Sequence, residues 1–188
     1  MTIATDPRRP DLGGNIRGGD PDTHSPEVWQ ALIDTFSPAA MLDVGCGEGH
    51  AVKWFIDHGI PSLGIDGLRD NVLNSVAGNQ LIWCDLTVMP YRFPVDLVIC
   101  IEVVEHIEER YLDNLLTTLC NGQIIAMTHA LPGQGGHHHV NMQPAEYWIE
   151  RICARGYEAL DPMPFRALVT GRKNYFSNSG LLFRRCAL

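Results

Sequence analysis

The stretch AMLDVGCGEGHAVKWFIDHG, residues 40–59, joins a short apolar segment, a glycine-rich turn and a helix-like segment. Residues 41–44 are apolar apart from Asp43, as expected of a buried strand. The glycines that follow let the backbone turn tightly and approach a ligand where the next helix starts. Apolar residues then recur at helical spacing up to Gly59, which is placed to end a helix. The stretch therefore predicts a strand, a ligand-binding loop and a helix.

The same alternation of strands and helices continues on both sides of this stretch. Apolar runs predict strands at 61–66, 80–85, 95–101 and 122–130, with two more in the tail. Helices are expected at 25–36, near 69–77, from about 102 to 120, and at 144–156. Inner strands that are apolar throughout are typical of a parallel sheet covered on both faces. Ligands bind such sheets at the carboxyl ends of the strands, so the residues after each strand are expected to form the site.

Length and composition indicate one globular domain. The chain has 188 residues, of which 45% are hydrophobic and 19% charged, enough to bury a core. Residues 25–188 are expected to form this domain. Residues 1–24, rich in Gly, Pro and Asp, are expected to be an irregular arm. A lid over the cofactor or acceptor is our hypothesis for this arm, and a disordered tail is the alternative.

The net charge and the cysteines limit the expected binding partners and the expected cellular compartment. A formal net charge of −8 argues against a phosphate-tracking surface, so we expect a small-molecule partner and no nucleic acid. No apolar run is long enough to span a membrane, and the N-terminus lacks the apolar core of a signal peptide. Six cysteines without a CxxC pair are interpreted as reduced thiols. We therefore expect a cytoplasmic monomer or homodimer.

Acidic residues follow successive strands of the predicted sheet. Asp66 lies 21 residues after Gly45, where an acid can bind both hydroxyls of a ribose. Asp85 follows the next strand, where it could accept a hydrogen bond from an adenine amino group. Glu102 follows the strand after that. Together these positions predict a site for an adenosine-containing cofactor.

Two cofactors compete for this site. A dinucleotide fingerprint reads GxGxxG, but counted from Gly45 its third glycine falls on His50. Asp43, two residues before Gly45, would sit badly beside a pyrophosphate. An acid at this position suits a cofactor that carries an ammonium and a sulfonium. The loop therefore favours S-adenosylmethionine, with a nicotinamide dehydrogenase as the less favoured interpretation.

The segments LDVGCGEGH, GIDG, WCDL and VDLVICIEVVEHI resemble the successive motifs of class I S-adenosylmethionine-dependent methyltransferases. The resemblance covers about residues 40–130. It implies a Rossmann-like, doubly wound α/β fold with a seven-stranded, mostly parallel sheet whose last strand is antiparallel. It also implies the cofactor-binding residues, namely Asp43, Gly45, Cys46, Gly47, Asp66, Gly67, Asp85, Leu86 and Glu102.

The segment EVVEH, residues 102–106, resembles the ExxEH element of two branches of this family. These are the ubiquinone-type O-methyltransferases and the small-RNA 2′-O-methyltransferases. In the second branch both glutamates, the histidine and a later histidine bind a divalent metal, which implies a site of Glu102, Glu105, His106 and a residue of GGHHHVN. His139 is our choice for the fourth ligand, with His138 next. Carboxylate and imidazole ligands suit Mg, Mn, Fe or Zn.

Metal-free interpretations of the same residues remain open. Glu102, Glu105 and His106 have the i, i+3, i+4 spacing of one helical face, and acids are favourable in a first helical turn. His106 with Glu105 could instead act as a general base without a metal. His129, just after the fifth strand, is either a further base facing the acceptor or a buried histidine with satisfied hydrogen bonds.

The leading prediction is a methyltransferase that methylates a hydroxyl oxygen of a small acceptor by in-line displacement. Ribose 2′-O-methylation of an RNA end is the alternative within catalysis, and the acidic composition counts against it. A non-catalytic, cofactor-binding subunit is the alternative outside catalysis. An intact cofactor loop argues for the enzyme.

Overall fold

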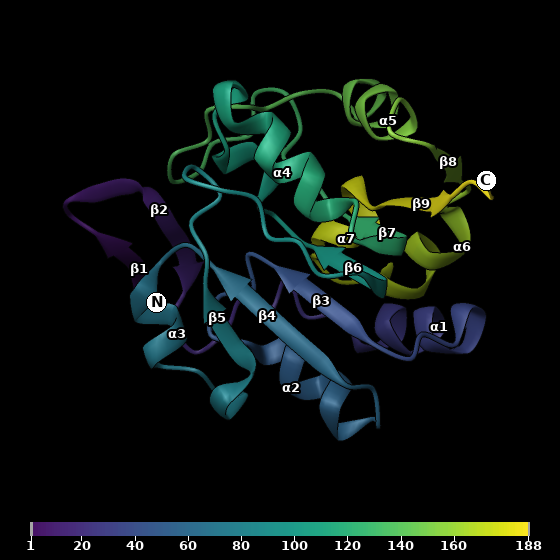
Figure 1. The fold of residues 1–188 in the computed structure, drawn as a ribbon, viewed down its shortest axis with the longest axis horizontal. Coiled ribbons are helices and arrows are strands. Elements are labelled where there is room, and N and C mark those ends of the chain that lie inside the picture. Colours follow the sequence, from purple (N-terminus) through teal and green to yellow (C-terminus); the bar gives the residue numbers. More distant parts are fainter. Residues whose placement is uncertain (1, 188) are drawn as a thin grey trace.

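The computed structural model describes residues 2–187 and is built on a seven-stranded sheet in the order β5-β4-β3-β6-β7-β9-β8 (Figure 1). All neighbouring strands are parallel except β9, which runs antiparallel to both β7 and β8. The predicted fold class and its antiparallel last strand are confirmed. The strands are β3 (Met41–Val44), β4 (Ser62–Asp66), β5 (Leu81–Trp83), β6 (Val95–Cys100), β7 (Gly122–Met127), β8 (Tyr157–Leu160) and β9 (Leu181–Arg185).

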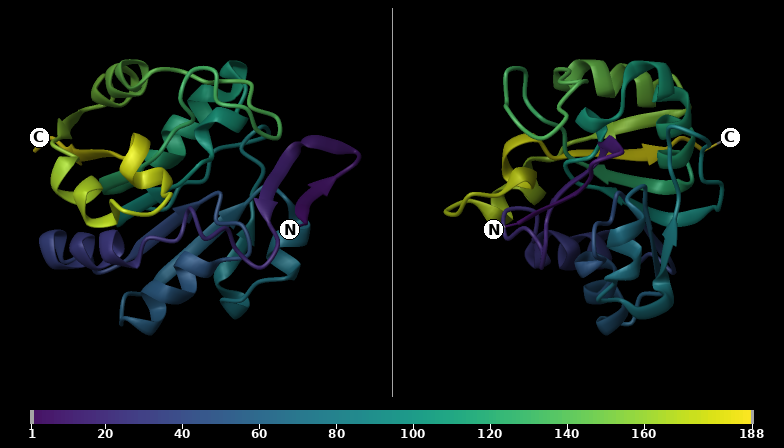
Figure 2. Two further views of the ribbon diagram at one scale, coloured as in Figure 1. Left: turned by 180° about the vertical axis from the view of Figure 1, so that it is seen from behind. Right: turned by 90° about the vertical axis from the view of Figure 1, so that its left-hand side faces the viewer.

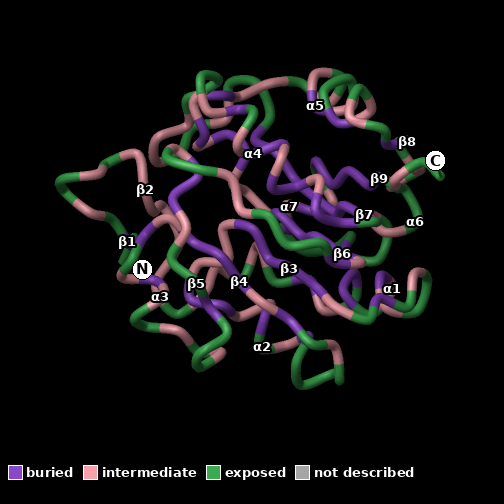
Figure 3. Tube along the Cα trace, in the orientation of Figure 1, coloured by how far each residue is buried: buried purple, intermediate pink, exposed green. Residues whose placement is uncertain are grey.

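Helices cover both faces of this sheet and bury two clusters of apolar side chains against it. One cluster includes Leu115 of α4 and Trp148 of α5. The other includes Trp29 of α1, Phe55 of α2 and Phe176 of α7. The central strands between the clusters are buried along almost their whole length (Figure 3). The helices are α1 (Pro26–Phe36), α2 (His50–Asp57), α3 (Arg69–Leu73), α4 (Leu112–Leu119), α5 (Ala145–Cys153), α6 (Met163–Arg166) and α7 (Tyr175–Ser179).

The segment after β6 does not form the continuous helix that the sequence predicted. Glu102 has a φ of +55°, outside the helical region, and only a 3₁₀ turn at Val104–His106 follows it. A second 3₁₀ turn, Glu109–Tyr111, leads into α4. The three polar residues of EVVEH therefore do not share one face of a helix, and that prediction is wrong. The expected helix near 69–77 is also shorter and ends at Leu73.

The sequence predicted an irregular N-terminal arm, but part of this arm is regular. Strands β1 (Ile3–Asp6) and β2 (Arg9–Ile16) pair antiparallel and form what we call the N-terminal hairpin. Gly13 has a φ of +92°, and a Cβ on it would lie 2.3 Å from the carbonyl oxygen of Ala4. The glycines therefore permit a close, bulged strand pairing. The hairpin projects from the main sheet beside α3 (Figures 1 and 2).

The helices and the cysteines can also be compared with the sequence predictions. Across residues 2–187, no helix combines the length and apolar character needed to cross a bilayer. All six cysteines are free, in agreement with the sequence interpretation.

Candidate active site

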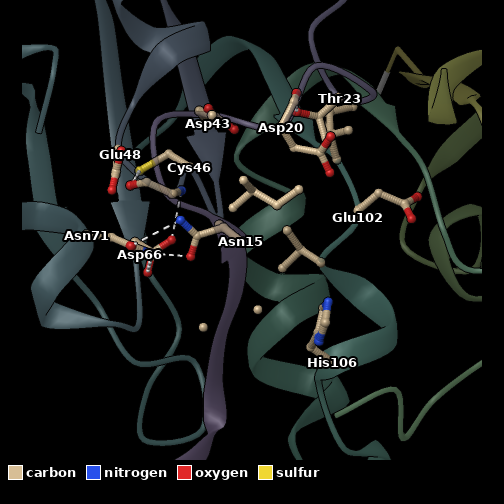
Figure 4. Close-up of a pocket in the computed structure, with 18 of the residues that line it drawn as sticks. Asn15, Asp20, Thr23, Asp43, Cys46, Glu48, Asp66, Asn71, Glu102 and His106 are labelled. Atoms are coloured by element: carbon tan, nitrogen blue, oxygen red, sulfur yellow. Dashed lines mark hydrogen bonds between the residues drawn. The ribbon is translucent and has the colours of Figure 1, made fainter. Parts of the chain in front are cut away.

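A cavity of about 880 Å³ opens at the carboxyl ends of the central strands (Figure 4). The N-terminal hairpin, the loop after β3, the turn after β6 and the loop after β7 all contribute to its walls. All the residues predicted to bind the cofactor line this cavity, namely Asp43, Gly45, Cys46, Gly47, Asp66, Gly67, Asp85, Leu86 and Glu102. The cavity is therefore the candidate site.

The loop after β3 requires glycine because it passes close to a neighbouring segment. Gly45 and Gly47 have φ values of +73° and +55°. A Cβ on Gly45 would lie 2.3 Å from Cγ2 of Val103, in the turn after β6. Any side chain at Gly45 would push these two walls of the cavity apart.

Asp66, the last residue of β4, holds this loop in place. Its Oδ2 accepts a hydrogen bond from the N–H of Gly47 at 2.9 Å, and its Oδ1 accepts one from the N–H of Leu68 at 2.8 Å. Asn71 donates a third bond to Oδ1 at 3.0 Å and is only 1% exposed. Burial raises the pKa of Asp66 to about 6, against the effect of these hydrogen bonds. Asn71 could not be predicted as a site residue, because an asparagine in a short helix carries no distinctive sequence signal.

Asp43 is a second buried acid in the wall of the cavity. Its side chain is 6% exposed, and burial, followed by the charge of Asp66, raises its pKa to about 8. A carboxylate with so little solvation is stabilised by a cation placed beside it.

His106 and His139 line the other side of the cavity, and they form a cluster with Glu105, which is fully buried and does not itself line the cavity. One potential ligand atom from each lies within 4.8 Å of the others. The imidazole rings of His106 and His139 are 4.9 Å apart and nearly perpendicular. Both carboxylate oxygens of Glu105 and Nδ1 of His106 are buried without a hydrogen-bond partner among the described residues. Buried polar atoms without partners are costly, and a bound cation would satisfy these atoms.

The loop that carries His139 is held against the turn after β6. The carbonyl of Glu105 accepts hydrogen bonds from the N–H groups of Val140 and Asn141, at 2.9 and 3.0 Å. The side chain of Asn141 donates to the carbonyl of Ile107 at 3.1 Å. Segments far apart in the sequence are thereby fixed beside each other, and the histidine at the end of the loop reaches the cluster.

Glu102 does not belong to this cluster, although the sequence resemblance implied that it would. Its Oε1 accepts a hydrogen bond from Oγ1 of Thr128 at 2.9 Å, and its Oε2 accepts one from Gln134 at 3.3 Å. Its φ is positive, so it is not part of the 3₁₀ turn that carries Glu105 and His106, although its charge still acts on Glu105. Burial raises the pKa of Glu102. The structure thus brings together three of the four predicted ligands.

His129 does not lie with the other predicted catalytic residues. It is 2% exposed and is not among the residues that line the cavity. Its Nδ1 hydrogen-bonds with the carbonyl of Ala130 at 3.1 Å, and burial lowers its pKa. The structure fits the alternative of a buried histidine with a satisfied hydrogen bond, and does not place His129 in the wall of the cavity.

Comparison with known proteins identifies the family. A family profile described as a methyltransferase domain matches residues 22–162, which is more than half of the chain. The chain belongs to the class I S-adenosylmethionine-dependent methyltransferases. No curated protein sequence matches this methyltransferase significantly.

Solved structures share its fold at low sequence identity. A TehB-like S-adenosylmethionine-dependent methyltransferase from Corynebacterium glutamicum is 21% identical, with a TM-score of 0.61 over 89% of this chain and 90% of that one. The magnesium protoporphyrin IX methyltransferase of Synechocystis with bound S-adenosylhomocysteine is 16% identical, with a TM-score of 0.60 over 85% and 80% of the two chains. The methyltransferase domain of bacterial CtHen1 is 15% identical, with a TM-score of 0.60 over 86% and 97%.

The cofactor of this methyltransferase is S-adenosylmethionine, and the residues of the cavity fit it. The glycine loop lines the cavity beside the end of β3, and Asp43 is a buried acid that a cation beside it would favour in its ionised form. Asp66 and Asp85 lie at or just after the ends of β4 and β5, where the sequence placed the ribose and adenine contacts.

Binding of S-adenosylmethionine is expected to release protons below about pH 8. Asp43 is largely protonated there in the free protein, because its pKa is raised to about 8, and a bound cation favours its ionised form. We expect release of up to about one proton at pH 7 and much less at pH 8.5. Titration calorimetry in two buffers of different ionisation enthalpy measures this number. The Asp43→Asn variant is the control and should lack this component of the release.

Proposed function

We propose that this methyltransferase transfers the methyl group to a hydroxyl oxygen of a small acceptor, with a divalent metal held by Glu105, His106 and His139. The observation that carries the proposal is this cluster, whose ligand atoms lie within 4.8 Å of one another. Both carboxylate oxygens of Glu105 and Nδ1 of His106 are buried without a hydrogen-bond partner among residues 2–187, whereas Nδ1 of His139 is hydrogen-bonded to the carbonyl of Gln134 at 3.1 Å. The donor set of one carboxylate and two imidazoles suits Mn, Fe or Zn.

The residues of the chain supply position and charge. A divalent metal in this cluster, when bound, lowers the pKa of a coordinated hydroxyl. Asp43 and Asp66 hold the cofactor from the opposite wall, so the methyl group and the acceptor oxygen meet within one cavity.

A metal-free mechanism in which His106 acts as the base is less well supported. Burial, together with the nearby His139 and His137, lowers the pKa of His106 to about 4. A general base works best when its pKa lies near the working pH. A neutral imidazole of this kind is suited to metal coordination instead.

The charges of the cavity favour a small acceptor without phosphate groups. Asp20, Glu27 and Glu102 line the cavity. Arg172 is the one Lys or Arg among the described lining residues, and its guanidinium already donates to Glu27 at 3.1 Å and to the carbonyl of His24 at 2.8 Å. Phosphate binding depends on available cationic or N–H donors. A neutral or cationic hydroxyl compound fits this wall better than an RNA end.

Ribose 2′-O-methylation of an RNA end is the second candidate. It is favoured by the resemblance of residues 102–106 to the ExxEH element. The cluster of Glu105, His106 and His139 is compatible with both candidates, so the two are distinguished by identifying the acceptor that is methylated.

Methyl transfer from labelled S-adenosylmethionine tests the proposal directly. A panel of phenols, sugars and amino sugars is compared with a short RNA, with Mn²⁺ added and after treatment with EDTA. We expect a labelled ether on a small hydroxyl compound, loss of turnover with EDTA and recovery with Mn²⁺. Turnover that resists EDTA would contradict the metal, and methylation of the RNA alone would favour the second candidate.

Gly136→Ala is expected to weaken metal binding without unfolding the protein. A Cβ on Gly136 would lie 2.1 Å from Nε2 of His139, so alanine forces this imidazole out of the cluster. Gly135→Ala is the matched control, because a Cβ there has nothing within 4 Å. We expect the dissociation constant for Mn²⁺ to rise roughly tenfold or more in the Gly136 variant and to stay unchanged in the control, as measured by calorimetry.

A further inference from the structure

The N-terminal hairpin contacts the residues that bind the cofactor, yet nothing in the reaction described above requires it. Asn15 of β2 exchanges hydrogen bonds with Asn71, at 2.9 and 3.2 Å, and Asn71 in turn donates to Asp66. Gly18, just after the hairpin, donates its N–H to Glu48 at 2.8 Å. Figure 4 shows Asn15 beside Asp66 and Asn71 at the cavity wall.

Arg9 makes the most specific of these contacts. Its Nη1 donates to Oδ2 of Asp85 at 2.7 Å, and its Nη2 donates to Oγ1 of Thr87 at 3.1 Å. The same guanidinium binds both carboxylate oxygens of Asp11, at 2.6 to 3.2 Å, so its plane is fixed from the hairpin side. These carboxylates raise the pKa of Arg9 further, and Arg9 lowers that of Asp11.

The hydrogen bonds around Asp85 leave little freedom for its carboxylate. Oδ1 already accepts bonds from the N–H and the hydroxyl of Thr87, at 2.9 and 2.7 Å. Oδ2 accepts only the bond from Arg9 among the described residues. A carboxylate oxygen has two acceptor positions, so one position on Oδ2 remains for a donor in the cavity.

The hairpin also reaches the other side of the cavity. A Cβ on Gly14 would lie 3.3 Å from the ring of His137 and 3.4 Å from Cε1 of His106. Leu12 lies over Gly67, whose added Cβ would be 2.9 Å from Cδ2 of Leu12. The N-terminal hairpin therefore contacts the parts of the cavity wall where the adenine, the ribose and the acceptor are expected.

We propose that Arg9 is a positioning residue for cofactor recognition. It fixes the Asp85 carboxylate so that the free acceptor position on Oδ2 receives the adenine amino group. Arg9 thereby couples closure of the hairpin to cofactor binding. The proposal depends on the family's cofactor and not on the acceptor or the metal. It extends the hypothesis that the arm is a lid, because it names Arg9 as the residue through which the arm responds to the cofactor.

Binding of two cofactor analogues tests the proposal in the full chain without an acceptor. S-adenosylhomocysteine carries the adenine amino group, whereas S-inosylhomocysteine carries an oxygen at that position. For Arg9→Ala we expect the dissociation constant of S-adenosylhomocysteine to rise about tenfold, and that of the inosine analogue to change little. Arg8→Ala is the control, since the Arg8 side chain is 92% exposed and pairs only with Asp6 among the described residues. Equal weakening of both analogues, or no weakening, would overturn the proposal.

A double-mutant cycle shows whether Arg9 acts through Asp85. We expect Arg9→Ala combined with Asp85→Asn to bind S-adenosylhomocysteine no more weakly than Asp85→Asn alone. Additive losses would mean that Arg9 acts elsewhere. Hydrogen exchange gives a second measurement: the cofactor analogue should protect residues 3–16 in the wild type and protect them less in Arg9→Ala. In Arg9→Lys, which keeps the charge but lacks the planar guanidinium, the protection of residues 3–16 should be intermediate between that of the wild type and that of Arg9→Ala.

Discussion

Replacing Glu105 by glutamine is expected to stabilise the metal-free protein while removing most of its turnover. Glu105 is 0% exposed, and neither of its carboxylate oxygens has a hydrogen-bond partner among the described residues. Burial, followed by the charge of Glu102, raises its pKa to about 8 from an ordinary value of 4.5. The native state therefore binds this proton more tightly than the unfolded chain, and stability falls as pH rises between those two values. Glutamine keeps the shape of the side chain and cannot ionise.

The stabilisation should depend on pH in a defined way. It should be absent below about pH 4 and reach on the order of 2–4 kcal/mol above pH 8, measured as the free energy of unfolding in urea. Turnover should fall roughly a hundredfold or more, because the variant loses a ligand of the proposed metal. Mn²⁺ should raise the melting temperature of the wild type but not of the variant. Glu150→Gln, on the exposed face of α5, is the control and should change neither quantity. Full turnover in Glu105→Gln would contradict the metal role.

Most of the sheet could be predicted because its strands are continuous apolar runs. Such segments as Val95–Cys100 and Gly122–Met127 have few ways to satisfy both their side chains and their backbone other than in a covered parallel sheet. The N-terminal hairpin could not be predicted in the same way. Its strands contain Gly13 and Gly14, and its side-chain hydrogen bonds to the rest of the protein are made with residues more than 50 positions away, as in the pair of Arg9 and Asp85.

The site was predictable to the extent that it depends on position after a strand. Asp43, Asp66 and Asp85 were placed correctly at the cavity because the topology brings the strand ends together. The fine geometry of EVVEH was not predictable, since Glu102 adopts a positive φ and bonds to Thr128 from another strand. Spacing in a sequence reports a helical face only when the backbone is helical, and here it is not.

Asp66→Asn is expected to weaken cofactor binding about a hundredfold. The carboxylate accepts N–H groups on both oxygens, from Gly47 at 2.9 Å on Oδ2 and from Leu68 at 2.8 Å on Oδ1. Asparagine has only one acceptor oxygen, so its NH₂ group must face one of these donors in either orientation. A buried donor left without an acceptor costs about 1–3 kcal/mol, and the cofactor also loses a charged acceptor for its ribose hydroxyls.

The loss should appear in cofactor binding more than in folding, because Gly47 belongs to the loop that lines the cavity and is predicted to contact the cofactor, and not to the core. Calorimetry with S-adenosylhomocysteine measures the dissociation constant, and thermal unfolding without ligand measures the cost to the fold. Asp34→Asn is the matched control, since Asp34 is exposed on α1 and accepts a hydrogen bond only from Gln30 among the described residues. A change of less than about threefold for Asp66→Asn would mean that the ribose is not bound at the end of β4. The glycine loop would then be organised by its own backbone, through the hydrogen bonds of Gly45 and Cys46 to the carbonyl of Ile65 at 2.9 and 3.0 Å, without the carboxylate.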